Sequence, residues 1–276
     1  MLENQLRNIL NSLSYLSAQG DVPVQAFTNL ISNANTKLLA ENLHQRWLSD
    51  HNFGHVAAKI LSFSHNEERR DMQLCSQVLQ LILDDYRNRY ELRQDDNRMF
   101  RNYCRTLIEL LPVYLQIDLH MGHGLVKPLF DSVNLLIDGA IEEEDFICMG
   151  QILVRSGNLL SDLCQVECDK LVIKTRKALC FHDRKLGSYS RFIMLNAIDL
   201  WTYKWNIELM PECLYDFYTT QYAEFNLNDY DERRWLPLGI KGRIESQSSL
   251  VAASSATRLS SKTVTPDPSV ETESFV

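Results

Sequence analysis

The sequence has little glycine and proline, with 10 and 7 residues in a chain of 276, and it has almost no sustained alternation of apolar and polar residues. An all-β fold needs many tight turns and that two-residue alternation, so this class is excluded. No apolar run approaches the roughly 20 residues that span a bilayer. No apolar core follows a basic start, as it would in a secretory signal. We therefore expect a soluble protein that does not bind membranes.

Known catalytic motifs are also missing. The chain lacks a glycine-rich phosphate loop, a Gly-x-Ser-x-Gly elbow and a His-Glu-x-x-His helix. His120 and His123 follow Asp118 in a segment that we expect to be a loop between helices. Solvated loop residues are favoured there over a metal or acid–base site. The sequence thus predicts a protein that is not an enzyme, with no catalytic residues and no cofactor.

The seven cysteines do not form a recognisable zinc pattern. Cys164 and Cys168 lie one helical turn apart, with His182 further on. A structural zinc site needs four ligands at suitable spacing, so buried thiols are favoured over a metal site. Because the number of cysteines is odd and most of them lie in apolar runs, we expect reduced core residues. This predicts an intracellular protein, in the cytoplasm and with the nucleus as a second location.

The formal net charge is −8, which argues against free, non-specific binding of nucleic acid. Basic residues nevertheless cluster at one place in the second half of the chain. A solvated helix face is favoured there, because Asp162, Glu167 and Asp169 are interspersed. The candidate contacts for RNA or a partner are Lys170, Lys174, Arg176, Lys177, Arg184 and Lys185.

Apolar residues recur at three- and four-residue spacing up to about residue 205, which predicts about ten helices. We expect an all-α, HEAT-like α-solenoid of about five antiparallel helix pairs, with a globular helical bundle as the alternative. Pro112 should kink or end its helix. Trp201 and Trp205 should be buried. The expected helices cover residues 2–18, 38–48, 53–63, 75–90, 97–117, 125–137, 142–160, 165–181 and 188–205, with another starting near Pro23.

The composition changes after the last of these helices. Residues 1–206 are predicted to form the repeat domain, 207–240 an aromatic and acidic extension, and 241–276 a disordered Ser/Thr/Pro-rich tail. Residues 212–225 are apolar enough to fold back as a further helix that caps the last pair. The next stretch, 226–238, could act as a linear motif, in which Tyr230, Asp231, Glu232 and Trp235 are the candidate contacts. A weaker prediction is that Val276 binds a PDZ-type domain.

Two segments resemble the middle domain of the eukaryotic initiation factor 4G family. Residues 144–153 (EDFICMGQIL) and 156–162 (SGNLLSD) are similar to the fourth-repeat signature of that domain, which has an acidic start and a cysteine-containing apolar helix. Residues 186–195 (LGSYSRFIML), followed by Ile198-Asp199-Leu200 and Trp205, resemble its closing helix. The order and spacing of these two segments match the family as well.

Weaker similarities lie upstream, at Phe53, residues 57–59, 79–90, 107–110 and 114–115. With them the resemblance covers most of residues 38–206. It departs from the family where Trp201 replaces the arginine usual after Ile-Asp-Leu, and where Glu109 follows Ile108 without the usual glycine. No tyrosine-based cap-factor motif is present, so direct binding of the cap factor is not implied.

The resemblance implies five HEAT-like helical pairs and a scaffold function. The chain is most similar to the small single-domain regulators, such as the paralogues that interact with the poly(A)-binding protein or the histone stem-loop-binding protein. It implies an adaptor in mRNA translation regulation that binds an mRNA-binding protein or translation initiation factor components. An RNA-binding protein that uses residues 165–181 and a HEAT-like scaffold unrelated to RNA are the alternatives.

Overall fold

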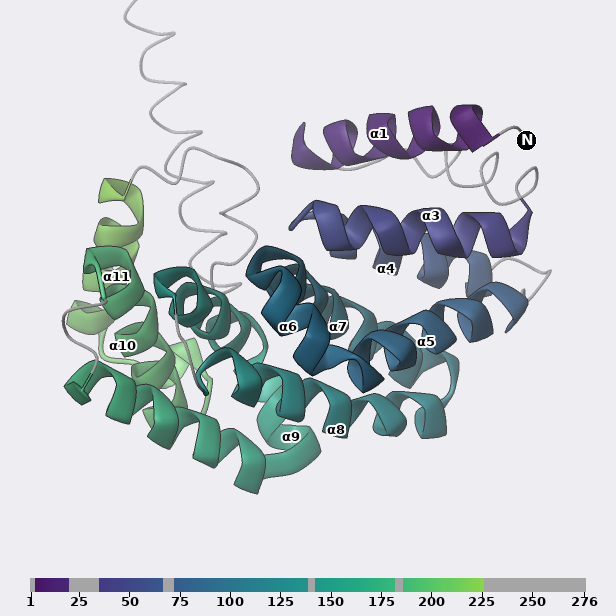
Figure 1. Cartoon of the computed structure of the whole chain (residues 1–276). Coiled ribbons are helices and arrows are strands. Elements are labelled where there is room, and N and C mark those ends of the chain that lie inside the picture. Colours follow the sequence, from purple (N-terminus) through teal and green to yellow (C-terminus); the bar gives the residue numbers. More distant parts are fainter. Residues whose placement is uncertain (1–2, 20–34, 67–71, 139–141, 182–185, 226–276) are drawn as a thin grey trace, which may run out of the picture. The chain divides into compact units, whose positions relative to one another are not determined.

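The computed structural model describes residues 3–19, 35–66, 72–138, 142–181 and 186–225 (Figure 1). Internal contacts divide the chain into Met1–Pro237 and Leu238–Val276, and every described residue belongs to the first unit. The helix predicted from Pro23 and the predicted disordered tail lie outside the described residues. So do the following predicted contacts: His182, Arg184, Lys185, Tyr230, Asp231, Glu232, Trp235 and Val276.

The described residues form ten α-helices, one short 3-10 helix and no strand. The α-helices are α1 (Glu3–Gln19), α3 (Thr36–Ser49), α4 (Phe53–Asn66), α5 (Met72–Arg87), α6 (Arg89–Asp95), α7 (Asn97–Ile117), α8 (Leu119–Leu136), α9 (Glu143–Phe181), α10 (Ser188–Thr202) and α11 (Glu212–Glu224). The 3-10 helix covers Ile207–Leu209.

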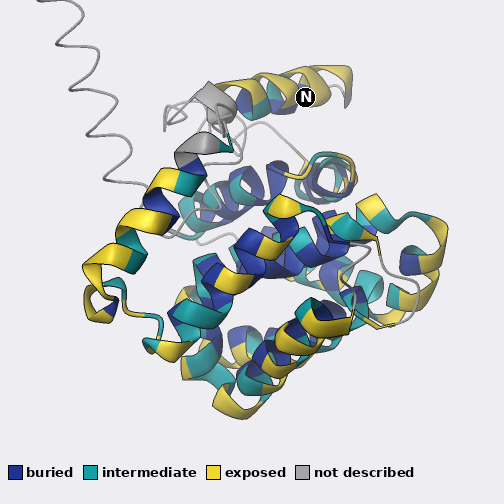
Figure 2. Cartoon of the chain, turned by 90° about the vertical axis from the view of Figure 1, so that its left-hand side faces the viewer, coloured by how far each residue is buried: buried dark blue, intermediate teal, exposed yellow. Residues whose placement is uncertain are grey.

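The main contacts of each helix are with helices close to it in the sequence. α1 packs on α3 and α4, α7 packs on α4 and α8, and α9 packs on α10. Figure 2 shows that the buried residues lie where the helices meet and the exposed ones on their outer sides. In α1, for example, Leu6, Leu10 and Leu13 form one buried stripe at helical spacing. This sequential stacking confirms the prediction of an all-α, solenoid-like fold.

Single capping residues join consecutive helices tightly. Asp96 caps α7, because its side chain accepts a hydrogen bond from the Met99 amide at 3.0 Å, and Asp118 caps α8 through the Met121 amide at 3.0 Å. Because α8 begins directly after Asp118, His120 and His123 lie exposed in its first turns. The expectation that these histidines lie in a loop was therefore wrong.

Helix α9 is kinked where the sequence predicts two separate helices. Cys164 has non-helical backbone angles, with φ −158° and ψ 84°, and helix continues on both sides of it. The two predicted helices therefore exist but meet at one residue instead of a loop. In α7, by contrast, the helix runs through Pro112 to Ile117, as the predicted range 97–117 has it, so of the two alternatives for this proline the early stop was wrong.

A buried carboxylate fixes the start of α9. Asp145 is fully buried, and its side chain accepts a hydrogen bond from the Glu142 amide at 2.9 Å. The same carboxylate is paired with Arg93 at 2.5 Å and Arg101 at 3.0 Å, so it joins the start of α9 to α6 and α7. The acidic run at residues 142–145 thus stabilises a helix N-terminus, as predicted, and ties three helices together.

Helix α11 packs on α10, as predicted for residues 212–225. The ring of Phe192 contacts the rings of Tyr218 and Tyr222 at centroid distances of 5.4 and 4.7 Å. Asn196 donates a hydrogen bond to the hydroxyl of Tyr222 at 2.7 Å, and Tyr218 donates one to Asp199 at 2.5 Å. This aromatic, hydrogen-bonded contact covers the side of α10 that would otherwise face water.

None of the seven cysteines, all of which lie in the described residues, forms a disulfide, and four of them are buried. Burial raises the pKa of the Cys104 and Cys148 thiols, which keeps them protonated and unreactive. Cys180 and Cys213 are exposed, however, so the expectation of core positions does not hold for these two.

Candidate interaction surfaces

Three of the predicted basic residues lie together on the second half of α9. Lys170, Lys174 and Lys177 share one helix face and line a hollow together with Glu167 and with Asn134 of α8. Ile173 also lines this hollow and is 49 % exposed. We call this group of residues the lysine hollow. It offers positive charge around one exposed aliphatic side chain.

Nearby carboxylates partly neutralise the lysine hollow. Lys170 pairs with Glu167 at 2.6 Å, and Lys174 pairs with Asp138 at 3.2 Å. Lys177 has no ion pair or hydrogen bond within the described part of the chain. Because exposed ion pairs contribute about 0–1 kcal/mol each, a partner's carboxylates can replace the internal ones.

Arg176 does not join this group, although the sequence places it in the same cluster. Its guanidinium lies over the Trp201 ring, 4.9 Å from the ring centroid, on a different side of α9. The predicted six-residue basic cluster is therefore split. Three lysines are brought together, one arginine is turned away, and the remaining two residues lie outside the described ranges.

A second hollow lies beside the kink of α9. Trp201 and Trp205 line it from the end of α10, and neither is fully buried. The prediction that both are core residues was therefore wrong. The hollow has a volume of about 490 Å³, and we call it the tryptophan hollow. Its other lining residues are Asn158, Ser161, Asp162, Gln165, Asp169, Thr202 and Lys204.

Hydrogen bonds fix both indole rings. The Trp201 Nε1–H donates to Asp169 at 2.8 Å, and the Trp205 Nε1–H donates to the Ser161 hydroxyl at 2.7 Å. The Ser161 hydroxyl in turn donates to the Cys168 sulfur at 3.3 Å, and burial raises the pKa of that thiol. Sequence reasoning missed this surface, because the helical pattern of α10 indicates burial and does not show that the helix ends at Thr202.

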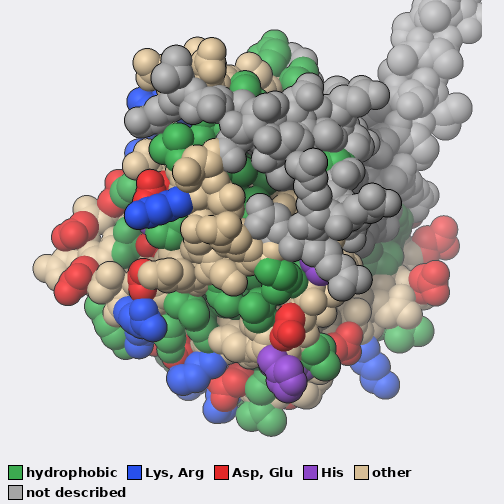
Figure 3. Space-filling view, turned by 90° about the vertical axis from the view of Figure 1, so that its right-hand side faces the viewer, with side chains coloured by type: hydrophobic (Ala, Val, Ile, Leu, Met, Phe, Trp, Pro, Cys, Tyr) green, Lys and Arg blue, Asp and Glu red, His purple; other side chains and the backbone are tan. Residues whose placement is uncertain are grey.

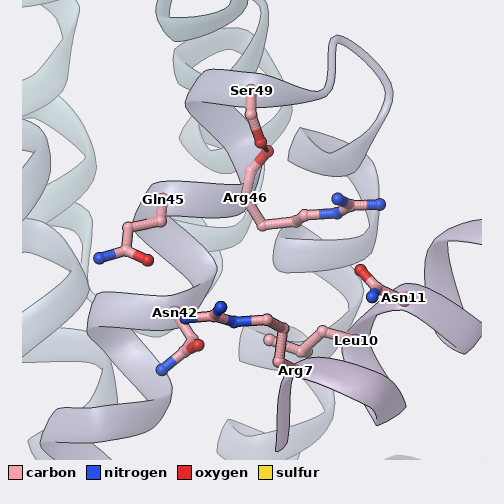
Figure 4. A pocket seen from close by; sticks show the side chains of 7 residues that line it. All are labelled: Arg7, Leu10, Asn11, Asn42, Gln45, Arg46 and Ser49. Atoms are coloured by element: carbon pink, nitrogen blue, oxygen red, sulfur yellow. Dashed lines mark hydrogen bonds between the residues drawn. The ribbon is translucent and has the colours of Figure 1, made fainter. Parts of the chain in front are cut away.

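A third hollow lies between α1 and α3 (Figure 4). Arg7 reaches from α1 toward α3 beside Asn42, and no carboxylate is among the lining residues. On the far side of the hollow Arg46 pairs with Asp50 at 3.6 Å. Gln45, Asn11, Leu10 and Ser49 complete the lining. Asp50 thus balances the charge of Arg46, one of the two arginines that line this hollow.

Charged side chains of both signs lie on the part of the surface that Figure 3 shows. Lysine and arginine alternate with aspartate and glutamate on the face shown in Figure 3. No group of three histidine, cysteine, aspartate or glutamate side chains within the described ranges could hold a metal ion. Nor is any described helix long and apolar enough to cross a lipid bilayer. What these surfaces can do is bind other molecules through charge and exposed rings.

The chain is similar to a translation initiation factor. The relative is the CBP80/20-dependent translation initiation factor of Xenopus tropicalis, to which the chain is 23 % identical over 210 residues. This alignment covers 74 % of the chain but only 36 % of the relative, so the chain spans about a third of the length of the protein it matches. No family model matches the chain.

Proposed function

We propose that the chain is a non-catalytic adaptor in translation initiation, which binds an mRNA-binding protein or initiation factor components through its helical-repeat surface. The observation that carries this proposal is the similarity to the CBP80/20-dependent translation initiation factor, which extends over 210 residues. The all-α repeat fold agrees with the resemblance to the middle domain of the initiation factor 4G family. The cytoplasm, with the nucleus as a second location, is where such an adaptor would act.

The lysine hollow is the partner surface that we infer for this adaptor. It combines three lysines with the exposed side chain of Ile173, so it fits a protein segment that carries acidic residues next to an apolar one. The carboxylates of Glu167 and Asp138, which pair with Lys170 and Lys174, lower the net positive charge of the hollow to about one unit. The net charge of the chain, −8, favours a protein partner over RNA, because binding to a phosphate backbone depends on positive charge.

Affinity purification of the full chain from cell extract, with and without RNase, tests the function. We expect initiation factors or mRNA-binding proteins to be recovered, and to remain bound after RNase treatment. Recovery that RNase abolishes would favour the alternative of RNA binding by the same lysines. Recovery of proteins unrelated to mRNA would contradict the proposed function.

Charge reversal tests the surface. The variant Lys170→Glu, Lys174→Glu, Lys177→Glu should lose the partners. The matched control, Lys37→Glu, Arg98→Glu, Lys127→Glu, changes the net charge equally at exposed positions outside the hollow and should keep them. If the first variant keeps every partner, binding lies elsewhere on the chain. In that case ending the chain at Phe225 shows whether the predicted motif with Tyr230, Asp231, Glu232 and Trp235 is the contact.

A further inference from the structure

The backbone at the end of α10 holds a conformation that large side chains rarely adopt. Lys204 and Trp205 both have positive φ, 55° and 58°, in the left-handed region. The Trp205 amide donates a hydrogen bond back to the Leu200 carbonyl at 2.6 Å, which turns the chain sharply. This turn directs the Trp205 ring onto α9. Bulky residues persist in this region only where the surrounding structure determines them.

The sequence of α9 leaves room for that ring. A Cβ atom at Gly157 would overlap the six-membered ring of Trp205, so only glycine fits at this position. The opposite end of the indole is fixed by its bond to Ser161. Three independent features therefore place a large aromatic ring at the edge of the tryptophan hollow instead of in the core.

Both rings can bind a ligand only through their π surfaces and edges. The two indole N–H groups already donate to Asp169 and Ser161, so neither is free to donate to a ligand. Arg176, which is not among the lining residues, lies over the Trp201 ring. The Trp201 ring therefore already binds one guanidinium group, that of Arg176, through its π surface.

The charge of the hollow is acidic. Asp162 is exposed and has no ion pair or hydrogen bond within the described residues. Asp169 accepts hydrogen bonds from two neutral groups, the Trp201 indole and the Gln165 amide, and it forms no ion pair within the described residues. Lys204 is the one cationic residue among those that line the hollow. Two carboxylates and one ammonium leave one negative charge in excess.

We propose that the tryptophan hollow docks an arginine side chain from a basic segment of a partner protein. The guanidinium stacks on the exposed indole surface and donates hydrogen bonds to the Asp162 carboxylate. Arginine fits better than lysine, because its planar fork can stack and donate to a carboxylate at the same time. The proposal rests on this geometry alone and does not depend on a role in translation.

The test uses the full chain and a synthetic peptide of three Gly-Ser-Arg repeats, with blocked ends. Its matched control replaces each arginine by citrulline, which has nearly the same shape but no charge. Binding is followed by NMR of the chain labelled with 15N at its tryptophan indoles. We expect saturable shifts of the Trp201 and Trp205 signals, while the signal of Trp47, which is 0 % exposed, stays in place. The citrulline peptide should bind about tenfold more weakly or not at all.

A pair of charge variants separates docking from general attraction to an acidic protein. Asp162→Lys should weaken binding about tenfold or more, because it replaces the paired carboxylate by a like charge. Glu91→Lys makes the same change of net charge at an exposed residue of α6 and should change the affinity less than twofold. Equal losses in the two variants would overturn the proposal. So would equal binding of the citrulline peptide, or no shift of the two indole signals at millimolar peptide.

Discussion

The first half of α9, residues 143–163, is buried on several sides, whereas the second half, residues 165–181, is buried along one stripe. In the first half even consecutive residues such as Cys148, Met149 and Gly150 are buried. In the second half Cys168, Leu171, Thr175 and Ala178 are buried at three- and four-residue spacing, and most residues between them are partly or fully exposed. The part of α9 before the kink at Cys164 is thus a core element, and the part after it is a surface element.

This difference separates residues that contribute to stability from residues that contribute to binding. The first half lies between α7 and α10, and its polar side chains are used in contacts that hold the repeats together, as at Asp145. The second half packs with one face only, so its lysines lie on the outer side of the helix, where a partner can contact them. Substitutions in the first half should therefore change stability, and substitutions on the exposed face of the second half should change binding.

The largest expected difference between the halves is in thiol reactivity. Cys180 is exposed, whereas Cys148 is fully buried and burial raises the pKa of its thiol. Cys148 can react only when the structure opens, so Cys180 should react about a thousandfold faster or more. Labelling with a thiol reagent, followed by mass spectrometry of the peptides, measures both rates. Similar rates would show that the first half of α9 is not protected.

Removal of the buried carboxylate should give the largest loss of stability. Asp145→Ala leaves Arg93 and Arg101 without their shared partner in a buried site, which should lower the free energy of unfolding by about 3–5 kcal/mol. Urea unfolding followed by circular dichroism measures this. Asp162→Ala, at an exposed position of the same half, should change it by no more than about 0.5 kcal/mol. Equal losses in the free energy of unfolding would contradict the expectation that the buried carboxylate contributes more than the exposed one.

A smaller effect is expected at the end of the first half. Gly157→Ala places a methyl group where the Trp205 ring lies, so the ring must move outward. The cost should be about 1–3 kcal/mol, as for other overpacked sites. Tryptophan emission should shift to the red as the indole becomes more exposed, and this shift distinguishes ring displacement from a loss of packing elsewhere. An unchanged spectrum would contradict the placement of Trp205.

The smallest effect on stability is expected in the second half. Lys177→Glu changes an exposed residue that forms no ion pair or hydrogen bond within the described residues. The free energy of unfolding should therefore change by about 0.5 kcal/mol or less. Recovery of the adaptor's partners should nevertheless fall. A thermal melt together with the purification experiment measures both quantities. A large stability loss would mean that this half of the helix is also part of the core.

Helical periodicity was sufficient to predict most of the fold. The buried stripe of Leu6, Leu10 and Leu13 follows from the spacing of apolar residues, and the return of residues 212–225 onto α10 follows from their apolar composition. The start of α8 was missed because Gly122 and Gly124 suggest a loop, while the decisive feature is the Asp118 side chain that caps the helix. Whether a helix continues through a glycine or a proline depends on its tertiary contacts, which periodicity does not contain.

The candidate surfaces were less predictable than the fold. The spacing of Lys170, Lys174 and Lys177 placed them correctly on one face, because that face depends only on the helix period. Lys174 pairs with Asp138, 36 residues away along the chain, and Arg176 contacts Trp201, 25 residues away in another helix. Neither contact could be predicted without the packed structure. The exposure of Trp205 depends on a backbone turn with positive φ, which no apolar pattern reveals.

The kink of α9 at Cys164 also limits where residues can be inserted or deleted in this protein. Loops between helices tolerate added or deleted residues, because the flanking helices keep their orientation. Here one residue connects the two halves of α9, and each residue of a helix turns the chain by about 100°. A single insertion next to Cys164 would rotate the stripe of Leu171, Thr175 and Ala178 away from the core. We therefore expect the number of residues between Gly157 and Lys170 to be fixed, even where their identities change.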